Sequence, residues 1–200
     1  MPQACGRVRP TRGNLHHGRG LGWIVIWGQA RWRRARPTLV RMGDLYQWGR
    51  AADGHEKRDS ETTSTLSTTD TPGHGDIITT SSSPYDWRSP QNDNLWQGVD
   101  GVNNPCPAGF RLPTQAEWNA ERGSWSSNNS SGAYGSPLKL PVAGYRYRGD
   151  GSLGNVGSRG DYWSSSVDGA GARRLNFRSG NAVMGSNARA YGYSVRCRKD

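Results

Sequence analysis

The sequence predicts an α+β domain of short, twisted antiparallel strands, one or two helices and long loops. Glycine is frequent, with 28 residues among 200, and hydrophobic residues make up only 32% of the chain. This composition favours turns and short strands over packed helices. Nine Trp and eight Tyr still supply enough large apolar side chains for a core, and a chain of this length suits one domain.

Most of the net charge of +10 belongs to residues 1–41. That segment holds nine Arg and no Lys, Asp or Glu, which leaves 17 basic and 16 acidic residues in the rest of the chain. A basic arm can bind phosphate without sequence preference, but a body with a net charge of +1 has no electrostatic footprint for nucleic acid. The chain also has no apolar run long enough to span a bilayer or to form a signal peptide.

Residues 1–42 form an anomalous basic segment, and residues 43–200 form the predicted domain. The stretch Arg31–Pro37 has neither helical nor strand periodicity, which predicts a disordered arm. Reverse translation provides a second interpretation. Codons for Leu21–Ala30, read two bases later, can spell Trp-Met-Asp-Arg-Asn-Leu-Gly-Ala-Ser, which is the pattern of a frame-shifted strand.

Aromatic segments and polar loops open the predicted domain. Tyr46 and Trp48 lie at strand spacing and are expected to pack on the core. Residues 59–83 are rich in Ser and Thr and predict a long surface loop. His55 and His74 lie in or beside this loop without ligand partners at metal spacing, so we expect them to be surface polar groups rather than metal ligands.

The clearest local element begins at Thr114. Thr114 and Glu117 stand in capping-box register, in which each side chain accepts a hydrogen bond from the backbone amide of the other residue. The pattern predicts a helix over residues 115–122 that ends at Gly123 and buries Trp118. The capping role accounts for Glu117 without assigning it to catalysis.

The rest of the chain predicts a loop followed by a sheet. Residues 124–136 are polar and predict a loop, whereas residues 138–146 alternate apolar with other side chains and predict a strand. Residues 161–166 predict the next strand. Leu175 and Phe177 then alternate with polar residues, which is the period of a strand with one buried face. A tight turn leads from it into a returning strand.

Five segments together carry a resemblance to a known family. They are Gly43–Gly54, Pro105–Trp118, Leu140–Arg146, Tyr162–Ser166 and Ser194–Cys197. In this order they resemble the Fibrobacter succinogenes major paralogous domain family, in the formylglycine-generating-enzyme-like branch of the C-type-lectin fold. The resemblance covers residues 43–200 and implies a C-type-lectin-like fold. The family's opening motif, Trp-Met-Asp-Arg-Asn-Leu-Gly, is absent as written and appears only in the shifted frame.

Within this family the chain is most similar to the variable proteins of diversity-generating retroelements. In those systems a reverse transcriptase copies a template with errors at adenines and installs the copy at the 3′ end of the gene, so that AAY codons become NNY codons. Such codons never encode Lys, Glu, Gln, Met or Trp, and Leu140–Arg198 contains no Lys, Glu or Gln. The resemblance implies a hypervariable region at about residues 157–198, with Trp163 and Met184 as fixed scaffold.

The expected ligand-binding residues are the outward positions of this region that NNY codons can encode. They are Arg159, Asp161, Asp168, Ala170, Arg174, Asn176, Arg178, Val183, Gly185, Ala188, Ala190, Tyr191 and Tyr193. The tyrosines and arginines are the expected anchors, because aromatic and guanidinium groups supply contact area and directed hydrogen bonds. The expected partner is a protein or glycan on another cell or particle, bound without a metal or other cofactor. Alternatively, these are ordinary exposed strand residues.

Cys106 and Cys197 flank the domain and are candidates for a disulfide. A bond that closes a loop of about ninety residues stabilises by roughly 4 to 5 kcal/mol in the chain-entropy model. It would imply an oxidising setting, outside the cell or at its surface. Two reduced, buried cysteines are the alternative.

Two other functions compete with the variable receptor. One is a surface adhesin or structural paralogue without hypervariation. The other is an enzyme of the formylglycine-generating type, which uses a pair of copper-binding cysteines. The chain has no match to that catalytic cysteine motif, no Ser/His/acid grouping and no paired carboxylates, so the sequence favours binding over catalysis.

Overall fold

In the computed structural model, residues 42–200 are described; the basic segment and its hypothetical shifted frame lie outside the described residues. The strands are β1 (Tyr46–Gln47), β2 (Thr62–Thr63), β3 (Ile77–Ile78), β4 (Phe110–Arg111), β5 (Tyr145–Arg146), β6 (Leu153–Gly154), β7 (Gly160–Asp168), β8 (Gly171–Phe177), β9 (Ala182–Ala188), β10 (Gly192–Tyr193) and β11 (Arg198–Lys199). The helices are α1 (Gln115–Gly123) and α2 (Ser130–Gly135). The predicted mixture of many short, mainly antiparallel strands with few helices is confirmed.

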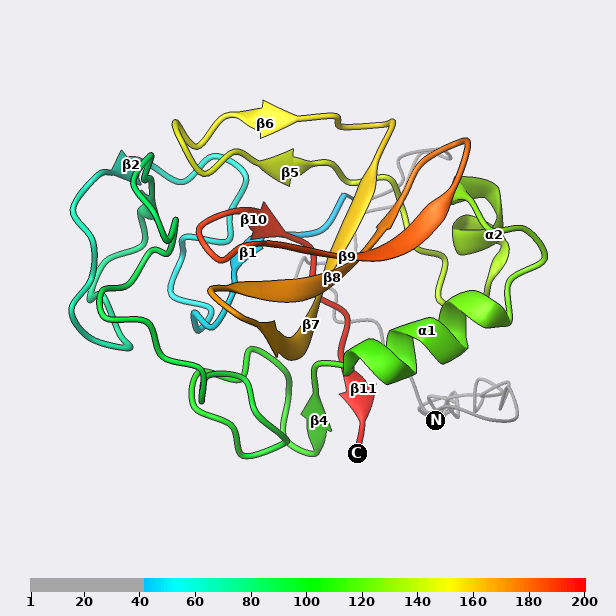
Figure 1. The fold of residues 1–200 in the computed structure, drawn as a ribbon, viewed down its shortest axis with the longest axis horizontal. Helices are drawn as coiled ribbons and strands as arrows, with labels where there is room; N and C mark the ends of the chain where they lie inside the picture. The colour runs from blue at the N-terminus through cyan, green and yellow to red at the C-terminus, as the bar shows by residue number, and fades with distance from the viewer. Residues whose placement is uncertain (1–41) are drawn as a thin grey trace, which may run out of the picture.

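The antiparallel sheet β7-β8-β9 lies at the centre of the fold (Figure 1). In β7 and β8, Gly160 pairs with Phe177 and Asp161 with Asn176, and β8 then turns back into β9. A second sheet, in the order β1-β10-β5-β6, brings the C-terminal β10 between two strands from earlier in the chain. The two predicted strands and the turn at the C-terminal end are therefore confirmed.

Two hydrophobic clusters lie on opposite faces of β7-β8-β9. Tyr162 packs with Trp118 of α1 and with Leu175 and Phe177, whereas Trp163 packs in the other cluster. Neighbours in a strand point to opposite faces, so each face of this sheet contributes to a core. The central sheet is thus covered by helices on one side and by the strand β10 with its surrounding loops on the other.

Helix α1 begins as its sequence predicts. The Thr114 hydroxyl accepts from the Glu117 amide at 3.3 Å, and the Glu117 carboxylate accepts from the Thr114 amide at 2.8 Å. The same carboxylate pairs with Arg111 of β4 and Arg198 of β11, while Trp118 is fully buried. Neither described helix has the length and hydropathy needed to cross a membrane.

Three local predictions are wrong at least in part. The predicted surface loop at residues 59–83 contains β2 and β3, and Ile77 and Ile78 are fully buried. The predicted loop at residues 124–136 contains α2, which begins because the Asn129 side chain accepts from the two amides of its first turn. The predicted strand at residues 138–146 forms a strand only over β5, with a single further bridge from Gly144 to Gly160. Lys139 and Gly144 have positive φ angles of 50° and 73°, which no extended strand contains.

Cys106 and Cys197 form a disulfide, with 5.7 Å between their Cα atoms and 91 positions between them in the sequence. The bond lies beside the antiparallel pair of β4 and β11, so a covalent bond and a short sheet join the middle of the chain to its end. The structure therefore contains the disulfide and not two reduced cysteines.

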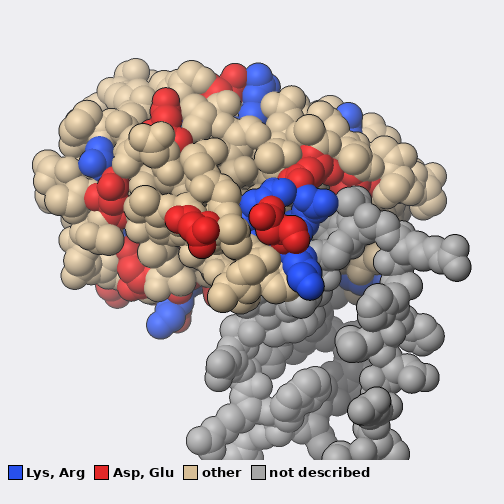
Figure 2. Space-filling view, turned by 90° about the horizontal axis from the view of Figure 1, so that it is seen from below, with Lys and Arg blue, Asp and Glu red and all other residues tan. Residues whose placement is uncertain are grey.

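The described body carries charges of both signs. On the face drawn in Figure 2, acidic and basic side chains are interspersed among neutral ones, and the basic ones do not gather into an extended patch. Electrostatic binding of nucleic acid needs such a patch. This face of residues 42–200 therefore offers no footprint of that kind.

Candidate ligand-binding face

The thirteen predicted ligand-binding positions lie on β7, β8, β9 and β10 and in the loops that join them. Burial divides them into two groups. Nine have solvent-exposed surface, namely Arg159, Asp168, Ala170, Arg174, Arg178, Val183, Gly185, Ala188 and Tyr191. Four are buried, namely Asp161, Asn176, Ala190 and Tyr193. The prediction that all thirteen point outward is therefore wrong for these four.

Asp161 and Asn176 lie under a second layer of structure, to which Tyr193 itself belongs. Alternation along β8 places Asn176 on the face opposite Leu175 and Phe177, as predicted, and Asp161 is its partner in β7. However, β10 crosses this face, where the ring of Tyr193 packs 4.5 Å from that of Trp163. A face that is polar by sequence is thus covered by a strand from elsewhere in the chain.

Asp161 is the buried centre of an ion-pair cluster on this face. Its side chain is fully buried and lies 2.8 Å from Nε of Arg159 and 2.7 Å from Nη1 of Arg174. Asn176 also donates to Asp161 Oδ1, at 3.1 Å. Burial raises the pKa of Asp161, while Arg174 and Arg159 oppose the rise. The two guanidinium groups in contact with it stabilise its charged form, and it holds two partly buried arginines in place.

A group of tyrosines adjoins this cluster. Tyr191 stacks on Tyr193 with ring centroids 5.5 Å apart, and Tyr145 meets both rings edge-on. Tyr147 contacts Tyr191 from the solvent side. Burial raises the pKa of Tyr193, so this hydroxyl stays protonated. Of the two tyrosines predicted as anchors, Tyr191 reaches solvent and Tyr193 supports it from below.

A hollow of about 400 Å³ opens beside the tyrosines. Three predicted residues line it, namely Ala170, Ala188 and Tyr191. Tyr85 and Arg148 also line it, and the sequence analysis missed both because they lie outside residues 157–198. For Arg148, the signal in the sequence is the alternation Tyr-Arg-Tyr-Arg at residues 145–148, which indicates a further segment with binding-type side chains.

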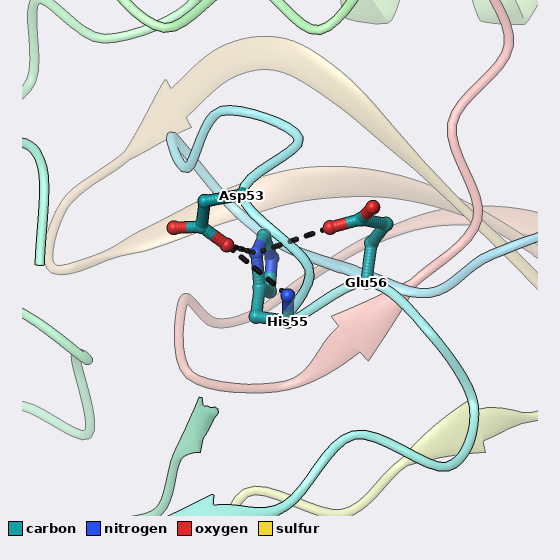
Figure 3. Close-up of side chains that lie close together, drawn as sticks. All are labelled: Asp53, His55 and Glu56. Carbon is teal, nitrogen blue, oxygen red and sulfur yellow. Dashed lines mark hydrogen bonds and ion pairs between the residues drawn. The ribbon is translucent and has the colours of Figure 1, made fainter. Parts of the chain in front are cut away.

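A separate group of titratable side chains follows β1, where Asp53, His55 and Glu56 lie close together (Figure 3). His55 is fully buried, so the expectation of a surface residue is wrong. Its Nδ1 lies 2.6 Å from Asp53 Oδ1, and its Nε2 accepts from the Gln47 amide at 3.0 Å. A nitrogen that accepts carries no proton, so His55 is the neutral tautomer with hydrogen on Nδ1. Both ring nitrogens are engaged within the protein, which disfavours metal binding.

The carboxylates near His55 also have partners. Burial alone would raise the pKa of Asp53, but the hydrogen bond from His55 and the contact with Arg50 at 2.7 Å lower it to about 2. Asp53 lines a second hollow, of about 360 Å³, together with Asp70. Asp70 pairs with Arg88 at 2.8 Å. These contacts make the region a structural network of loops.

The burial of neutral His55 predicts a loss of stability in mild acid. Burial lowers the pKa of His55, so the unfolded chain, with a His pKa of about 6.5, takes up the proton first. The stability that the burial of neutral His55 contributes is complete above about pH 6.5 and is lost progressively below it. We expect the free energy of unfolding in urea to fall between pH 7.5 and pH 5.5.

The variant His55→Gln is the control for this prediction. Its amide oxygen can accept from the Gln47 amide in place of Nε2, but it does not titrate. The variant should lose the decline between pH 7.5 and pH 5.5 that the unsubstituted protein shows. An equal decline in both proteins would contradict the assignment of the tautomer.

No protein-family model, curated protein or solved structure matches this chain significantly. Its function is therefore inferred from the geometry of the face and from the sequence pattern.

Proposed function

We propose that residues 43–200 form a ligand-binding domain of the receptor or adhesin type. In this proposal the domain presents a hypervariable surface on a C-type-lectin-like scaffold and is diversified by a retroelement. The proposal rests on one observation, namely that the face consists of two layers. Exposed positions that NNY codons can encode lie over a buried layer that includes Asp161, Trp163 and Tyr193.

The layering separates positions that tolerate exchange from positions that do not. Exposed substitutions change stability by less than about 0.5 kcal/mol, whereas buried polar groups and core rings carry larger penalties. At Gly185, an added Cβ would meet nothing closer than the Arg174 guanidinium at 4.0 Å. Trp163, which NNY codons cannot encode, is fully buried and donates to the Tyr46 carbonyl at 2.8 Å.

The proposed partner is a protein or glycan on another cell or particle. Tyrosine and arginine side chains dominate the face, as in many binding surfaces. The disulfide between Cys106 and Cys197 supports a setting outside the cell or at its surface, because disulfides persist in oxidising compartments.

An adhesin without hypervariation is the second candidate, and it would use the same face. A formylglycine-generating-type enzyme has less support. Such an enzyme needs two free thiols to hold copper, whereas Cys106 and Cys197 are bonded to each other. The face itself brings together arginines, tyrosines and two carboxylates, Asp161 and Asp168, each of them paired with arginine, which suits binding better than acid–base chemistry.

The nucleotide sequence of the locus tests the retroelement. We expect a neighbouring reverse transcriptase gene and a near-copy of the 3′ end that differs only at adenines. The differences should fall mainly at the codons of the positions that have exposed surface and do not pair with the buried Asp161, namely Asp168, Ala170, Arg178, Val183, Gly185, Ala188 and Tyr191. Without such a template the adhesin becomes the better proposal, and formylglycine formation on a cysteine-containing peptide would favour the enzyme.

A pair of libraries tests the layering directly. One library randomises Val183, Gly185 and Tyr191, and the matched library randomises Asp161, Asn176 and Tyr193, in the full chain displayed under oxidising conditions. We expect most members of the first library to resist proteolysis and most members of the second to be degraded. Equal survival in the two libraries would contradict the assignment of an exchangeable surface over a fixed layer.

A further inference from the structure

Arg148 is the arginine that lines the hollow, and, like Arg178 but unlike three other arginines of the ligand-binding face, it has no carboxylate partner among residues 42–200. Arg159 and Arg174 share Asp161, and Arg173 pairs with Asp168 at 2.8 Å. No Asp or Glu of residues 42–200 forms an ion pair with Arg148; the acid closest in sequence, Asp150, instead accepts from the Ser152 amide at 2.8 Å. Arg148 is thus a positive charge without a counter-charge beside the hollow.

The guanidinium of Arg148 is held in place without a ligand. It lies over the ring of Tyr85, 3.9 Å from the centroid, and donates from Nη1 to the Thr80 carbonyl at 2.8 Å. A guanidinium carries five N–H donors in a planar fork that matches a carboxylate. Because this side chain is already ordered, binding an anion loses less side-chain entropy.

The remaining lining of the hollow carries no charge. Ser186 contributes a hydroxyl, and Tyr85 and Tyr191 contribute aromatic surface. The side-chain amide of Asn187 instead donates to Tyr193 and accepts from the Ala188 amide. A sugar acid presents matching groups, because it combines a carboxylate with hydroxyls and an apolar C–H face. The volume of about 400 Å³ lies near the lower end of the range of roughly 300–1,000 Å³ for small-ligand sites.

The residues that line the hollow favour one sugar ring over a peptide as its ligand. Its lining comes from the turn after β7, through Ala170 and Gly171, and from the segment at Pro84 and Tyr85. A peptide strand extends by about 3.3 Å per residue and depends on backbone partners along its length. A single ring needs only side-chain donors and an aromatic surface, which the hollow provides.

We propose that this hollow binds one acidic sugar residue, with its carboxylate on Arg148 and its ring against Tyr85 and Tyr191. The inference rests on the proposed function in one respect, namely that this face binds a ligand. It does not depend on whether a retroelement diversifies the face.

Amide NMR titration of the full chain tests the inference, with glucuronate as the probe and glucose as the neutral sugar of matched size. We expect glucuronate to shift amides around Arg148 and Ser186 and to bind roughly tenfold more tightly than glucose, since one charge-assisted hydrogen bond supplies about that factor. Arg148→Gln should remove this preference. Arg148→Lys, which keeps the charge but loses the fork, should retain part of it.

Lys139→Gln is the matched control, because it removes one exposed positive charge outside the lining of the hollow. It should bind glucuronate as the unsubstituted protein does, and thermal melting of each variant confirms that it folds. Equal affinities for glucuronate and glucose, or no shifts at the hollow, would overturn the inference. Stronger shifts of the same amides with triglutamate would also overturn it, in favour of an acidic peptide.

The outcomes separate the two proposals. A retroelement template at the locus together with no binding of glucuronate would remove only the acidic sugar. Specific binding of glucuronate without a template would leave the acidic-sugar site in place and remove the hypervariation.

Discussion

Loss of the Cys106–Cys197 disulfide is expected to lower the free energy of unfolding by roughly 4 to 5 kcal/mol. The bond closes a loop across 91 positions, and a loop of this length removes much conformational entropy from the unfolded chain. Most domains are stable by only about 5–15 kcal/mol. The double variant Cys106→Ser/Cys197→Ser should therefore unfold at a much lower urea concentration than the parent protein.

Reduction provides the control for the disulfide. Dithiothreitol should destabilise the unsubstituted protein by about as much as the double substitution does, and it should leave the double variant unchanged. If dithiothreitol has no effect on the unsubstituted protein, the two cysteines do not form the bond in solution.

The substitution Asp161→Asn is expected to destabilise the protein by about 3 kcal/mol. It removes the shared counter-charge and leaves two guanidinium groups with little access to water, because the side chains of Arg159 and Arg174 are only 24% and 12% exposed. Loss of one member of a buried ion pair typically reduces stability by about 3–5 kcal/mol. Because both arginines keep some exposure to water, we expect an effect at the lower end of this range.

Asp168→Asn is a matched control on the same strand. It makes the same chemical change, but Asp168 and its partner Arg173 are about one third exposed, and surface pairs contribute only about 0–1 kcal/mol. Urea unfolding of both variants at pH 7 measures the difference. Similar effects of the two substitutions would contradict the division of the face into a fixed buried layer and an exchangeable surface.

Local signals in the sequence predicted local structure well. Thr114 and Glu117 predicted the start of α1 because a capping box involves only residues three positions apart. The alternation at Leu175 and Phe177 predicted β8 and its buried face. The loop prediction for residues 124–136 was wrong because α2 has only six residues, and its one strong local signal is the Asn129 side chain that caps its first turn. So short a helix depends on tertiary packing.

The candidate site was predictable only in part. The pattern of the C-terminal region predicted outward positions, of which Val183 is exposed and Gly185 and Tyr191 are partly buried. Period-two alternation distinguishes the two faces of a strand, but it does not reveal whether another strand covers the polar face. Asp161, predicted to point outward, is therefore buried under β10, and Tyr193 of β10 is buried where it packs on Trp163.

The class of the fold, the capped helix, the central strands and the two cysteines that can bond were all readable from residue types. Each of these depends on spacing within a few positions or on the small number of cysteines. In contrast, the cover of β10 over the polar face of β7-β8-β9 and the contact of Arg148 with Tyr85 became visible only in the folded protein. Such contacts join residues tens of positions apart, and no local periodicity encodes them.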